Sequence, residues 1–236
     1  MLEVHLLTLF PDAVRGYLQA SILGRAQAAG RVKVEVTDFR EFAKDRHHKV
    51  DDRPFGGGPG MVLKPEPIFD AVEWIEGRFG PCHKILLTPA GQRFEQATAA
   101  RLAEKERLLL LCGRYEGFDE RIRLGIAWQE LSMGDFVLSG GELPALAVLE
   151  ATARLIPGVL GDADSAPADS FTADPRLLDH PQYTRPVVFR DMPVPEVLRS
   201  GDHGAIAAWR RAQAEQRTNE RRPDLAERDP SSTKTT

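Results

Sequence analysis

The stretch RLLLLCGRYEGFDERI (Arg107–Ile122) decides the fold class. Four leucines run without interruption from Leu108 to Leu111, as in strands that are buried on both faces of a parallel sheet. A loop with two glycines follows at Cys112–Gly117, and the residues from Asp119 onward predict a helix. A buried strand, a loop and a helix in this order are typical of an α/β protein with a mainly parallel sheet.

Strand-like and helix-like segments also alternate on the N-terminal side of this stretch. Val32–Val36 has the alternation of a strand, and Pro67–Phe79 places its apolar residues at helical spacing. The apolar run Lys84–Leu87 predicts another strand, and the residues after its loop predict a helix through Glu106. The sequence therefore predicts one α/β domain over residues 1–160.

Three loops with glycine or proline each separate a predicted strand from a predicted helix. They are LTPAGQ (87–92), CGRYEG (112–117) and LSGGELP (138–144), and the apolar run Phe136–Leu138 is taken as the strand before the third. Ligands bind open α/β sheets beyond the carboxyl ends of the strands. Ordinary connections would have the same form, but three of them together favour one shared ligand site.

The residues of these loops speak against a phosphate as the ligand. Neither G-x-x-x-x-G-K-[ST] nor G-x-G-x-x-G after a strand occurs in the chain. Glu116 lies in one loop, and Glu142 directly follows Gly141 in another. Negative charge at a helix N-terminus satisfies the dipole that a phosphate would otherwise use. The loops therefore predict a neutral or cationic ligand that is held by backbone groups.

The loop DDRPFGGGPGMV (51–62) predicts a flexible or tightly turned cover, and no strand is expected before it. A solvated surface loop is the alternative interpretation. Residues 45–53, which overlap the start of this loop, contain candidates for phosphate contacts: Arg46, His47, Lys49 and Arg53. The neighbours His47 and His48 are not expected to form a metal pair, because adjacent residues seldom converge on one ion.

Composition limits the class of protein. The chain has 236 residues, 42% hydrophobic and 28% charged, with a net charge of −4, and no run of eighteen apolar residues predicts a membrane span. The N-terminus lacks the features of a secretory leader. The two cysteines, Cys82 and Cys112, form no C-x-x-C pair, which excludes a disulfide framework and a cysteine-rich zinc site. We expect a cytoplasmic protein.

The composition and the periodicity of the sequence change after residue 160. Residues 161–174 are small, acidic and non-periodic, which predicts an interdomain linker or a mobile loop. Residues 175–236 predict a second, mostly helical domain, with a helix over His203–Arg221 capped by Ser200 or Asp202. Ile206 and Trp209 are expected to face inward, and the tail RDPSSTKTT is expected to be disordered.

Five motifs in chain order closely resemble one family, the bacterial tRNA (guanine-37-N1)-methyltransferases (TrmD). They are DDRPFGGGPGM, CGRYEGFDERI, DFVLSGGELPA, RLIPGVLG and LLDHPQYTRP. The likeness runs from the first strand to about Arg222. It implies a SPOUT-class domain with a deep trefoil knot, knot loops that bind S-adenosyl-L-methionine, and a homodimer whose active sites are shared between the chains. It also implies a C-terminal domain that binds tRNA.

Carried over position by position, the resemblance implies these cofactor contacts: Leu87, Thr88, Pro89, Gly113, Tyr115, Glu116, Gly117, Ser132, Met133, Gly134, Asp135, Phe136, Val137, Leu138, Gly140, Gly141 and Pro144. The family commonly has Ser-Pro-Gln-Gly where this chain has Thr88-Pro89-Ala90-Gly91, so a side-chain amide at position 90 is lost. Glu116 is also the candidate for a Mg²⁺ ligand, although no compact set of carboxylates specifies such a site.

The resemblance also implies the catalytic residues. Asp169 is the expected general base for the N1 proton of guanine, and Arg154 the expected support for the anionic base. The residues alone would not single out Asp169 among its acidic neighbours, and Arg154 could pair with Glu150 one turn earlier on a helix surface. Two alternatives stay open: a SPOUT methyltransferase for another RNA position, and a non-catalytic RNA-binding regulator of the same fold.

The C-terminal region has the charge expected for RNA contact. Nine arginines against six acids lie between Arg176 and Arg222. Eight of these arginines are candidates for phosphate contacts: Arg185, Arg190, Arg199, Arg210, Arg211, Arg217, Arg221 and Arg222. About half of them are expected to pair with acids or to solvate the helix instead.

Overall fold

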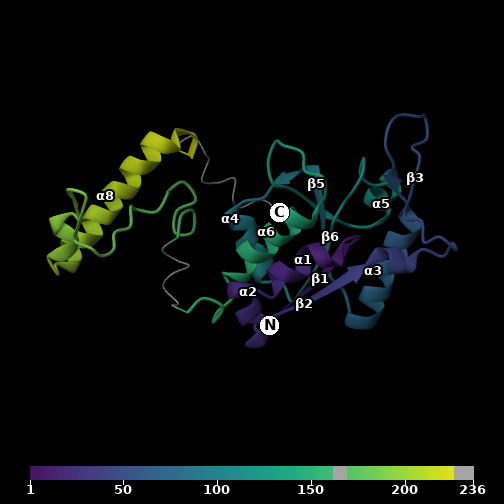
Figure 1. Ribbon diagram of the computed structural model, residues 1–236, viewed down its shortest axis with the longest axis horizontal. Coiled ribbons are helices and arrows are strands. Elements are labelled where there is room, and N and C mark those ends of the chain that lie inside the picture. The colour runs from purple at the N-terminus through teal and green to yellow at the C-terminus, as the bar shows by residue number, and fades with distance from the viewer. Residues whose placement is uncertain (162–168, 226–236) are drawn as a thin grey trace. The chain divides into compact units, whose positions relative to one another are not determined.

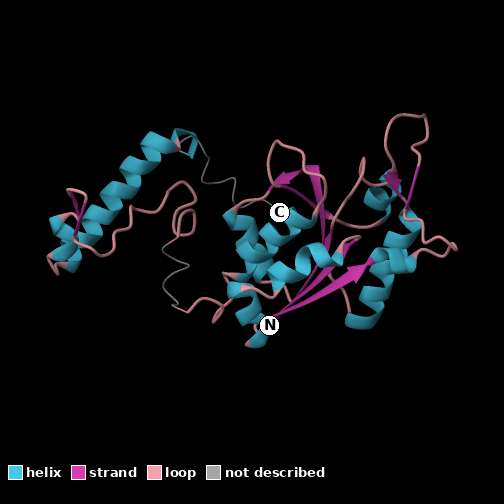
Figure 2. Cartoon of the chain, in the orientation of Figure 1, coloured by secondary structure: helices cyan, strands magenta, loops and turns pink. Residues whose placement is uncertain are grey.

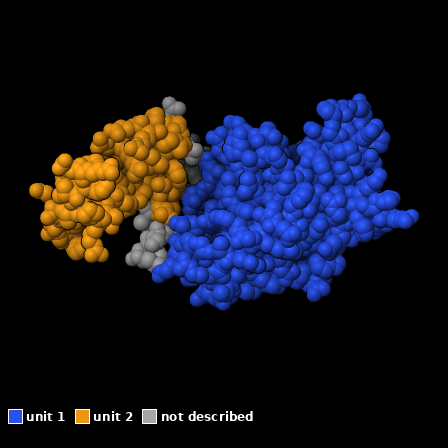
Figure 3. Space-filling view, in the orientation of Figure 1, with its two compact units in different colours: residues 1–163 blue, residues 164–236 orange. Residues whose placement is uncertain are grey.

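The computed structural model describes residues 1–161 and 169–225 (Figures 1 and 2). The chain divides into two compact units, unit 1 at Met1–Ala163 and unit 2 at Asp164–Thr236 (Figure 3). The division falls inside the acidic segment 161–174. Half of that segment (162–168) and the tail for which disorder was predicted lie outside the described residues.

Unit 1 is a mixed α/β structure built on a five-stranded sheet with the order β2-β1-β6-β5-β7, in which every neighbouring pair is parallel. Its strands are β1 (Leu2–Thr8), β2 (Val32–Asp38), β5 (His83–Arg93), β6 (Arg107–Leu111) and β7 (Gln129–Ser132). Its helices are α1 (Pro11–Leu18), α2 (Ser21–Ala28), the 3₁₀ turn η1 (Phe39–Phe42), α3 (Pro65–Phe79), α4 (Gln96–Ala103), α5 (Glu120–Gly125) and α6 (Glu142–Ala153).

The four leucines of β6 explain how the sheet is buried. Leu108 and Leu110 belong to a core cluster with α1, α2, α4 and α6, whereas Leu109 and Leu111 belong to a second cluster with η1, α3 and α5. All four side chains have no exposed surface. Successive strand residues point to opposite faces, so a central strand that is covered on both faces needs an apolar residue at every position.

The predicted boundaries around LTPAGQ were wrong. The strand does not end at Leu87, because β5 continues to Arg93 and pairs with β7 again after an irregularity between Leu87 and Gln92. At Gly91 the strand lies so close to its neighbour that a Cβ would be 2.5 Å from the carbonyl carbon of Glu130. The helix that follows ends at Ala103, since β6 already begins at Arg107.

The loop at 51–62 is a hairpin, so the expectation that no strand precedes it was wrong. The short strands β3 (Asp51–Asp52) and β4 (Val62–Leu63) pair in antiparallel fashion. Four glycines between them have positive φ, at positions 56, 57, 58 and 60, which accounts for the glycine content of the turn. Two-residue strands are too short to show an alternation in sequence, so the sequence did not predict β3 and β4.

Unit 2 contains β8 (Val188–Phe189), β9 (Met192–Pro193), η2 (Glu196–Arg199), α8 (His203–Arg221) and η3 (Pro223–Leu225). The predicted helix is confirmed as α8, and its N-cap is Asp202, whose Oδ1 accepts the amide of Ala205 at 3.0 Å. Ile206 and Trp209 are half-buried, while the fully buried residues of α8 are Ala214 and Thr218.

Both cysteines of the chain are buried in unit 1. Burial raises the pKa of the Cys82 thiol to about 11. Burial and the nearby Glu142 carboxylate raise the pKa of the Cys112 thiol well above its usual range. Since the thiolate is the reactive form of cysteine, both side chains are unreactive parts of the core.

His5 is a buried ionisable group in the middle of β1. Its side chain is 1% exposed, packs against the ring of Phe79 at a centroid distance of 4.6 Å, and lies 3.8 Å from the Glu3 carboxylate. Burial lowers the pKa of His5 despite the carboxylates of Glu3 and Glu35, and Arg107 and Lys33 act in the same direction as burial. His5 is therefore neutral in the folded protein near pH 7.

This predicts a pH dependence of stability. Because the folded-state pKa of His5 lies below the unfolded value of 6.5, its contribution is complete above that pH and is lost as pH falls toward the lowered pKa. The free energy of unfolding should fall by up to about 1.4 kcal/mol per pH unit in this window. Urea unfolding of the wild type and of His5→Leu at pH 7.5 and 5.5 measures it, and equal losses in both proteins would contradict the assignment.

Candidate functional site

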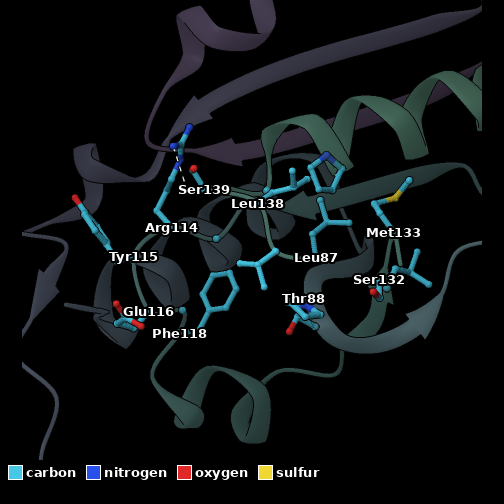
Figure 4. A pocket seen from close by; sticks show the side chains of 18 of the residues that line it. Leu87, Thr88, Arg114, Tyr115, Glu116, Phe118, Ser132, Met133, Leu138 and Ser139 are labelled. Atoms are coloured by element: carbon cyan, nitrogen blue, oxygen red, sulfur yellow. Dashed lines mark hydrogen bonds between the residues drawn. The ribbon is translucent and has the colours of Figure 1, made fainter. Parts of the chain in front are cut away.

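A cavity of about 390 Å³ lies in unit 1 at the carboxyl ends of β6 and β7 and beside the irregular part of β5. Four segments line it: Leu87–Pro89 in β5, the loop after β6 (113–118), Glu120 and Arg123 in α5, and the segment from the end of β7 to the first turn of α6. Figure 4 shows Leu87, Thr88, Phe118, Met133 and Leu138 around this space. The three predicted loops therefore converge on one pocket.

Of the residues that the resemblance assigns to the cofactor, the structure brings all but Asp135 into the lining of this pocket. Asp135 is instead exposed and pairs with Arg93 at 3.1 Å. Sequence reasoning missed other lining residues: Arg114, Phe118, Glu120, Arg123, Leu131 and Ser139. Phe118 directly follows the loop CGRYEG, so extending that loop by one residue would have included it.

The strand predicted at Phe136–Leu138 was wrong. The strand before the third loop is β7, which ends at Ser132, and Phe136–Leu138 lie in the loop itself. Gly134 has a φ of +143°, which turns the chain away from the sheet. The exposed fractions of Phe136, Val137 and Leu138 are 56%, 85% and 41%, so this apolar run is surface rather than core.

Glycines allow the pocket loops to lie against each other. A Cβ on Gly141 would be 2.7 Å from the Cα of Cys112, and a Cβ on Gly113 would be 2.8 Å from the ring of Phe118. The amide of Gly141 also donates to the carbonyl of Gly113 at 2.9 Å. The backbone of one loop thus forms the wall of the next, and no side chain fits between them.

The charges at the pocket are largely neutralised by neighbouring side chains. Arg123 pairs with Glu130 at 2.9 Å and with Glu120 at 3.2 Å. Arg114 pairs with Glu142 at 2.9 Å. Both arginines of the pocket lining thus form ion pairs with glutamates. Neither of these two guanidinium groups is left to neutralise a phosphate. These ion pairs support the expectation of a neutral or cationic ligand, which stays a prediction.

The hairpin at 51–62 is attached to the pocket through the loop after β6. The amide of Glu116 donates to the carbonyl of Met61, and the amide of Leu63 donates to the carbonyl of Gly117. The side chain of Glu116 lies against Gly60, where a Cβ would meet its carboxylate. This close contact accounts for a glycine at position 60, which also has a φ of +78°.

Glu116 is the residue that the sequence offers as a Mg²⁺ ligand. Among residues 1–161 and 169–225, no three His, Cys, Asp or Glu side chains lie together in a way that could hold a metal ion. Mg²⁺ usually keeps several water ligands and is held by one or two carboxylates together with substrate oxygens, so Glu116 as a Mg²⁺ ligand stays a prediction.

The two candidate catalytic residues belong to different units. Arg154 is half-buried at the C-cap of α6, at the opposite end of that helix from the pocket. Asp169 lies in a turn of unit 2. Within unit 2 this turn is fixed to the LLDHPQYTRP motif, since Ser170 Oγ accepts the amide of Asp179 at 2.8 Å and the amide of Phe171 donates to the carbonyl of Leu177.

Unit 2 also presents cations on its surface. Six of the eight candidate arginines are exposed: Arg185, Arg190, Arg199, Arg210, Arg211 and Arg221. Arg211 pairs with Glu215, and Arg222 pairs with Asp224. In the β8–β9 hairpin the guanidinium of Arg190 lies 5.2 Å from the ring centroid of Phe189, which is 54% exposed. Cations beside exposed aromatic rings are typical of surfaces that bind single-stranded RNA.

Across the described parts of the chain, no helix is both long enough and apolar enough to span a membrane.

Comparison with known proteins gives a consistent result. The family model described as "tRNA (Guanine-1)-methyltransferase TrmD" matches residues 2–228. A tRNA (guanine-N(1)-)-methyltransferase of Anaeromyxobacter sp. (strain K) is 55% identical over 224 residues, which cover 95% of this chain and 90% of the relative. The proteins of the same name from Symbiobacterium thermophilum and Dehalococcoides mccartyi are 54% and 50% identical, over 94% and 96% of this chain and 90% and 91% of their own lengths.

Proposed function

The chain belongs to the TrmD family of tRNA (guanine-N1)-methyltransferases, and we propose that it transfers a methyl group from S-adenosyl-L-methionine to N1 of guanosine 37 in the anticodon loop of tRNA. The observation that carries the proposal is the pocket formed by the irregular part of β5 and by the loops that follow β6 and β7.

The pocket residues fit the methyl donor. A volume of about 390 Å³ lies in the usual range of small-molecule sites, roughly 300–1,000 Å³. Gly113, Gly140 and Gly141 line the pocket without side chains, so a ligand can come close to the loop backbone. Leu87, Leu131 and Leu138 supply apolar walls. When bound, the donor supplies an electrophilic methyl group on a positively charged sulfur, which the neutralised lining tolerates.

The target base needs a proton acceptor, because N1 of guanine carries a proton at neutral pH. Asp169 accepts this proton, so that the N1 lone pair becomes available to form the new bond to carbon. The guanidinium of Arg154 stabilises the negative charge that develops on O6 as the proton leaves. These roles are general-base catalysis and electrostatic stabilisation of a developing oxyanion.

Helix geometry supports an active site that is shared between two chains. Pro144 in the first turn of α6 lines the pocket, whereas Arg154 caps the other end of the same 12-residue helix. At about 1.5 Å per residue the helix separates them by roughly 15–18 Å. An arginine side chain does not span that distance, so the pocket of one protomer is completed by the partner subunit's Arg154. Sedimentation at micromolar concentration should give twice the monomer mass of 26.2 kDa.

The path of the chain supports the SPOUT-type knot. The strand β5 lies between β6 and β7 in the sheet. After β7 the chain therefore crosses the end of β5 to reach the loop that follows β6, where Arg114 and Gly140 form an isolated bridge. Such a crossing is rare among folds. An electron-density map that traces α6 outside the loop after β6 would contradict the knot.

Unit 2 is proposed to bind the tRNA, in the cytoplasm where this substrate lies. Its exposed arginines supply phosphate contacts, which make binding dependent on salt. The rings of Phe189 and Tyr183, both about half exposed, are available to stack on unpaired bases. An anticodon-loop nucleotide is unpaired, so its extrusion into the active site costs less than that of a base in a duplex.

One experiment separates this proposal from the two alternatives. The protein is incubated with labelled S-adenosyl-L-methionine and with two unmodified tRNA transcripts that differ only in carrying guanosine or adenosine at position 37. We expect label only in the guanosine transcript. Equal label in both would point to a methyltransferase for another position. Binding of tRNA without label in either would point to a non-catalytic regulator.

A further inference from the structure

We propose that Arg114 and Glu142 are positioning residues that hold two of the pocket loops at the separation needed to bind the methyl donor. The proposal rests on the proposed function, since it assumes that the pocket is the donor site. Arg114 belongs to the loop after β6, and Glu142 begins α6 directly after Gly140 and Gly141. Their ion pair thus connects two segments that are far apart in sequence. Figure 4 shows Arg114 beside Ser139, which lies just before Glu142 on the second of these segments.

Glu142 is a buried carboxylate with partners on two other segments. Its residue is 4% exposed. Oε1 accepts the hydroxyl of Thr8 at 2.6 Å, at the end of β1, and the Nε of Arg114 at 3.3 Å. Oε2 lies 2.9 Å from the second guanidinium nitrogen of Arg114. The carboxylate therefore points into the protein and away from any ligand at the N-terminus of α6.

Arg114 makes further contacts that fix its orientation. A third guanidinium nitrogen donates to the carbonyl of Ser139 at 3.3 Å. The guanidinium carbon lies 4.3 Å from the centroid of the Phe10 ring, on the segment between β1 and α1. The two-pronged contact with Glu142 and the ring contact use the planar shape of arginine, which lysine does not reproduce.

The ion pair of Arg114 and Glu142 lies directly against Gly140, which lines the pocket. A Cβ at this position would lie 2.4 Å from the Nε of Arg114 and 2.5 Å from the Oε2 of Glu142. The pair therefore passes directly over the glycine backbone that lines the pocket. Because Arg114 also donates to the carbonyl of Ser139, we expect a displacement of the pair to shift this backbone and the groups that would contact the donor.

A buried ion pair of comparable exposure lies at the opposite end of the sheet and provides a matched control. Arg107 Nε is 2.9 Å from the Oε2 of Glu3, with side chains 15% and 11% exposed, compared with 24% and 6% for Arg114 and Glu142. Arg107 begins β6 and is absent from the pocket lining. Removing either arginine takes a cation from a buried carboxylate and should destabilise the fold, although Glu3 keeps its ion pair with Lys33 and Glu142 keeps the hydroxyl of Thr8. Only removal of Arg114 should affect the donor.

The test compares Arg114→Met, Arg114→Lys and Arg107→Met. Calorimetry measures the dissociation constant of S-adenosyl-L-methionine, thermal melts measure stability, and methylation assays separate KM for the donor from kcat. We expect Arg114→Met to weaken donor binding by about tenfold or more, with kcat at saturating donor within about threefold of the wild type. Arg114→Lys should recover only part of the affinity. Arg107→Met should lower the melting temperature and leave the dissociation constant unchanged.

Two results would overturn the proposal: unchanged donor affinity in Arg114→Met, or an equal loss of affinity in both methionine variants. The second would show that the pair acts only through overall stability. A wild-type protein that fails to bind the donor would instead contradict the proposed function itself, so the two failures are distinguishable.

Discussion

Replacing Asp169 by asparagine should lower the single-turnover rate of methyl transfer by about 10²–10⁴-fold, the usual contribution of a positioned general base. Asparagine keeps the size and shape of the side chain, but it cannot accept the N1 proton of guanine. The turn that carries Asp169 is held by bonds from Ser170 and Phe171, so the substitution leaves its backbone anchors in place. Because all the described residues that line the pocket proposed for the methyl donor belong to unit 1, donor affinity should not change.

The measurement is rapid quench with saturating donor and tRNA, together with donor titration of the same variant. Asp202→Asn is the matched control, because it makes the same change in unit 2 at the N-cap of α8, where asparagine caps a helix as well as aspartate. It should react at the wild-type rate. A normal rate in Asp169→Asn would remove this residue from the role of base.

The second large effect is expected from Gly141→Ala. The backbone of Gly141 has a φ of −83°, which alanine adopts without strain, so the effect is steric alone. The new Cβ would lie 2.7 Å from the Cα of Cys112 and 2.8 Å from the amide nitrogen of Gly113, and neither backbone atom can rotate away. Relief requires the two pocket loops to separate. We expect a loss of about 1–3 kcal/mol in stability from overpacking and a loss of donor affinity of about a hundredfold.

Gly77→Ala is the control for this substitution. Gly77 lies inside α3, and a Cβ there would meet nothing within 4 Å. Alanine is favoured over glycine in a helix interior by about 1 kcal/mol, so this variant should be slightly more stable and bind the donor normally. Donor titrations and urea unfolding of both variants provide the comparison. Wild-type donor affinity in Gly141→Ala would mean that contact between the loops does not shape the site.

Much of the architecture follows from local patterns in the chain. The leucines of β6 predicted a strand buried on both faces, and the structure places them in two separate cores. The 19-residue helix α8 has the predicted bounds and one of the two predicted caps. In both cases many consecutive residues carry the same signal, because burial or helical spacing constrains each of them.

The wrong predictions concern short segments, in which only a few residues indicate the secondary structure. Phe136–Leu138 is as apolar as a short strand, but its composition does not reveal that the preceding Gly134 turns the chain out of the sheet. The irregular part of β5 after Leu87 was taken for a loop because proline and glycine usually end a strand. The sequence also contained no sign that Arg114 and Glu142 meet, since their contact joins positions 28 residues apart.

The expected roles of Asp169 and Arg154 could not be inferred from local sequence patterns. An aspartate among other acids and an arginine one turn after a glutamate have ordinary structural explanations, so only the family resemblance suggests their roles. Catalytic function depends on the groups that surround a bound substrate, and here two protomers and an RNA would supply them. Local sequence patterns contain no information about such an assembly.

The burial of both cysteines has a practical consequence for studies in solution. The chain has only Cys82 and Cys112, and their raised pKa values keep them protonated and inaccessible at neutral pH. We therefore expect the native protein to react very little with maleimide dyes. A single cysteine introduced at an exposed position of α8, such as Gln216→Cys, would be the one site that takes up the label. Fluorescence from that site could then follow unit 2 as tRNA is added, without first removing any natural thiol.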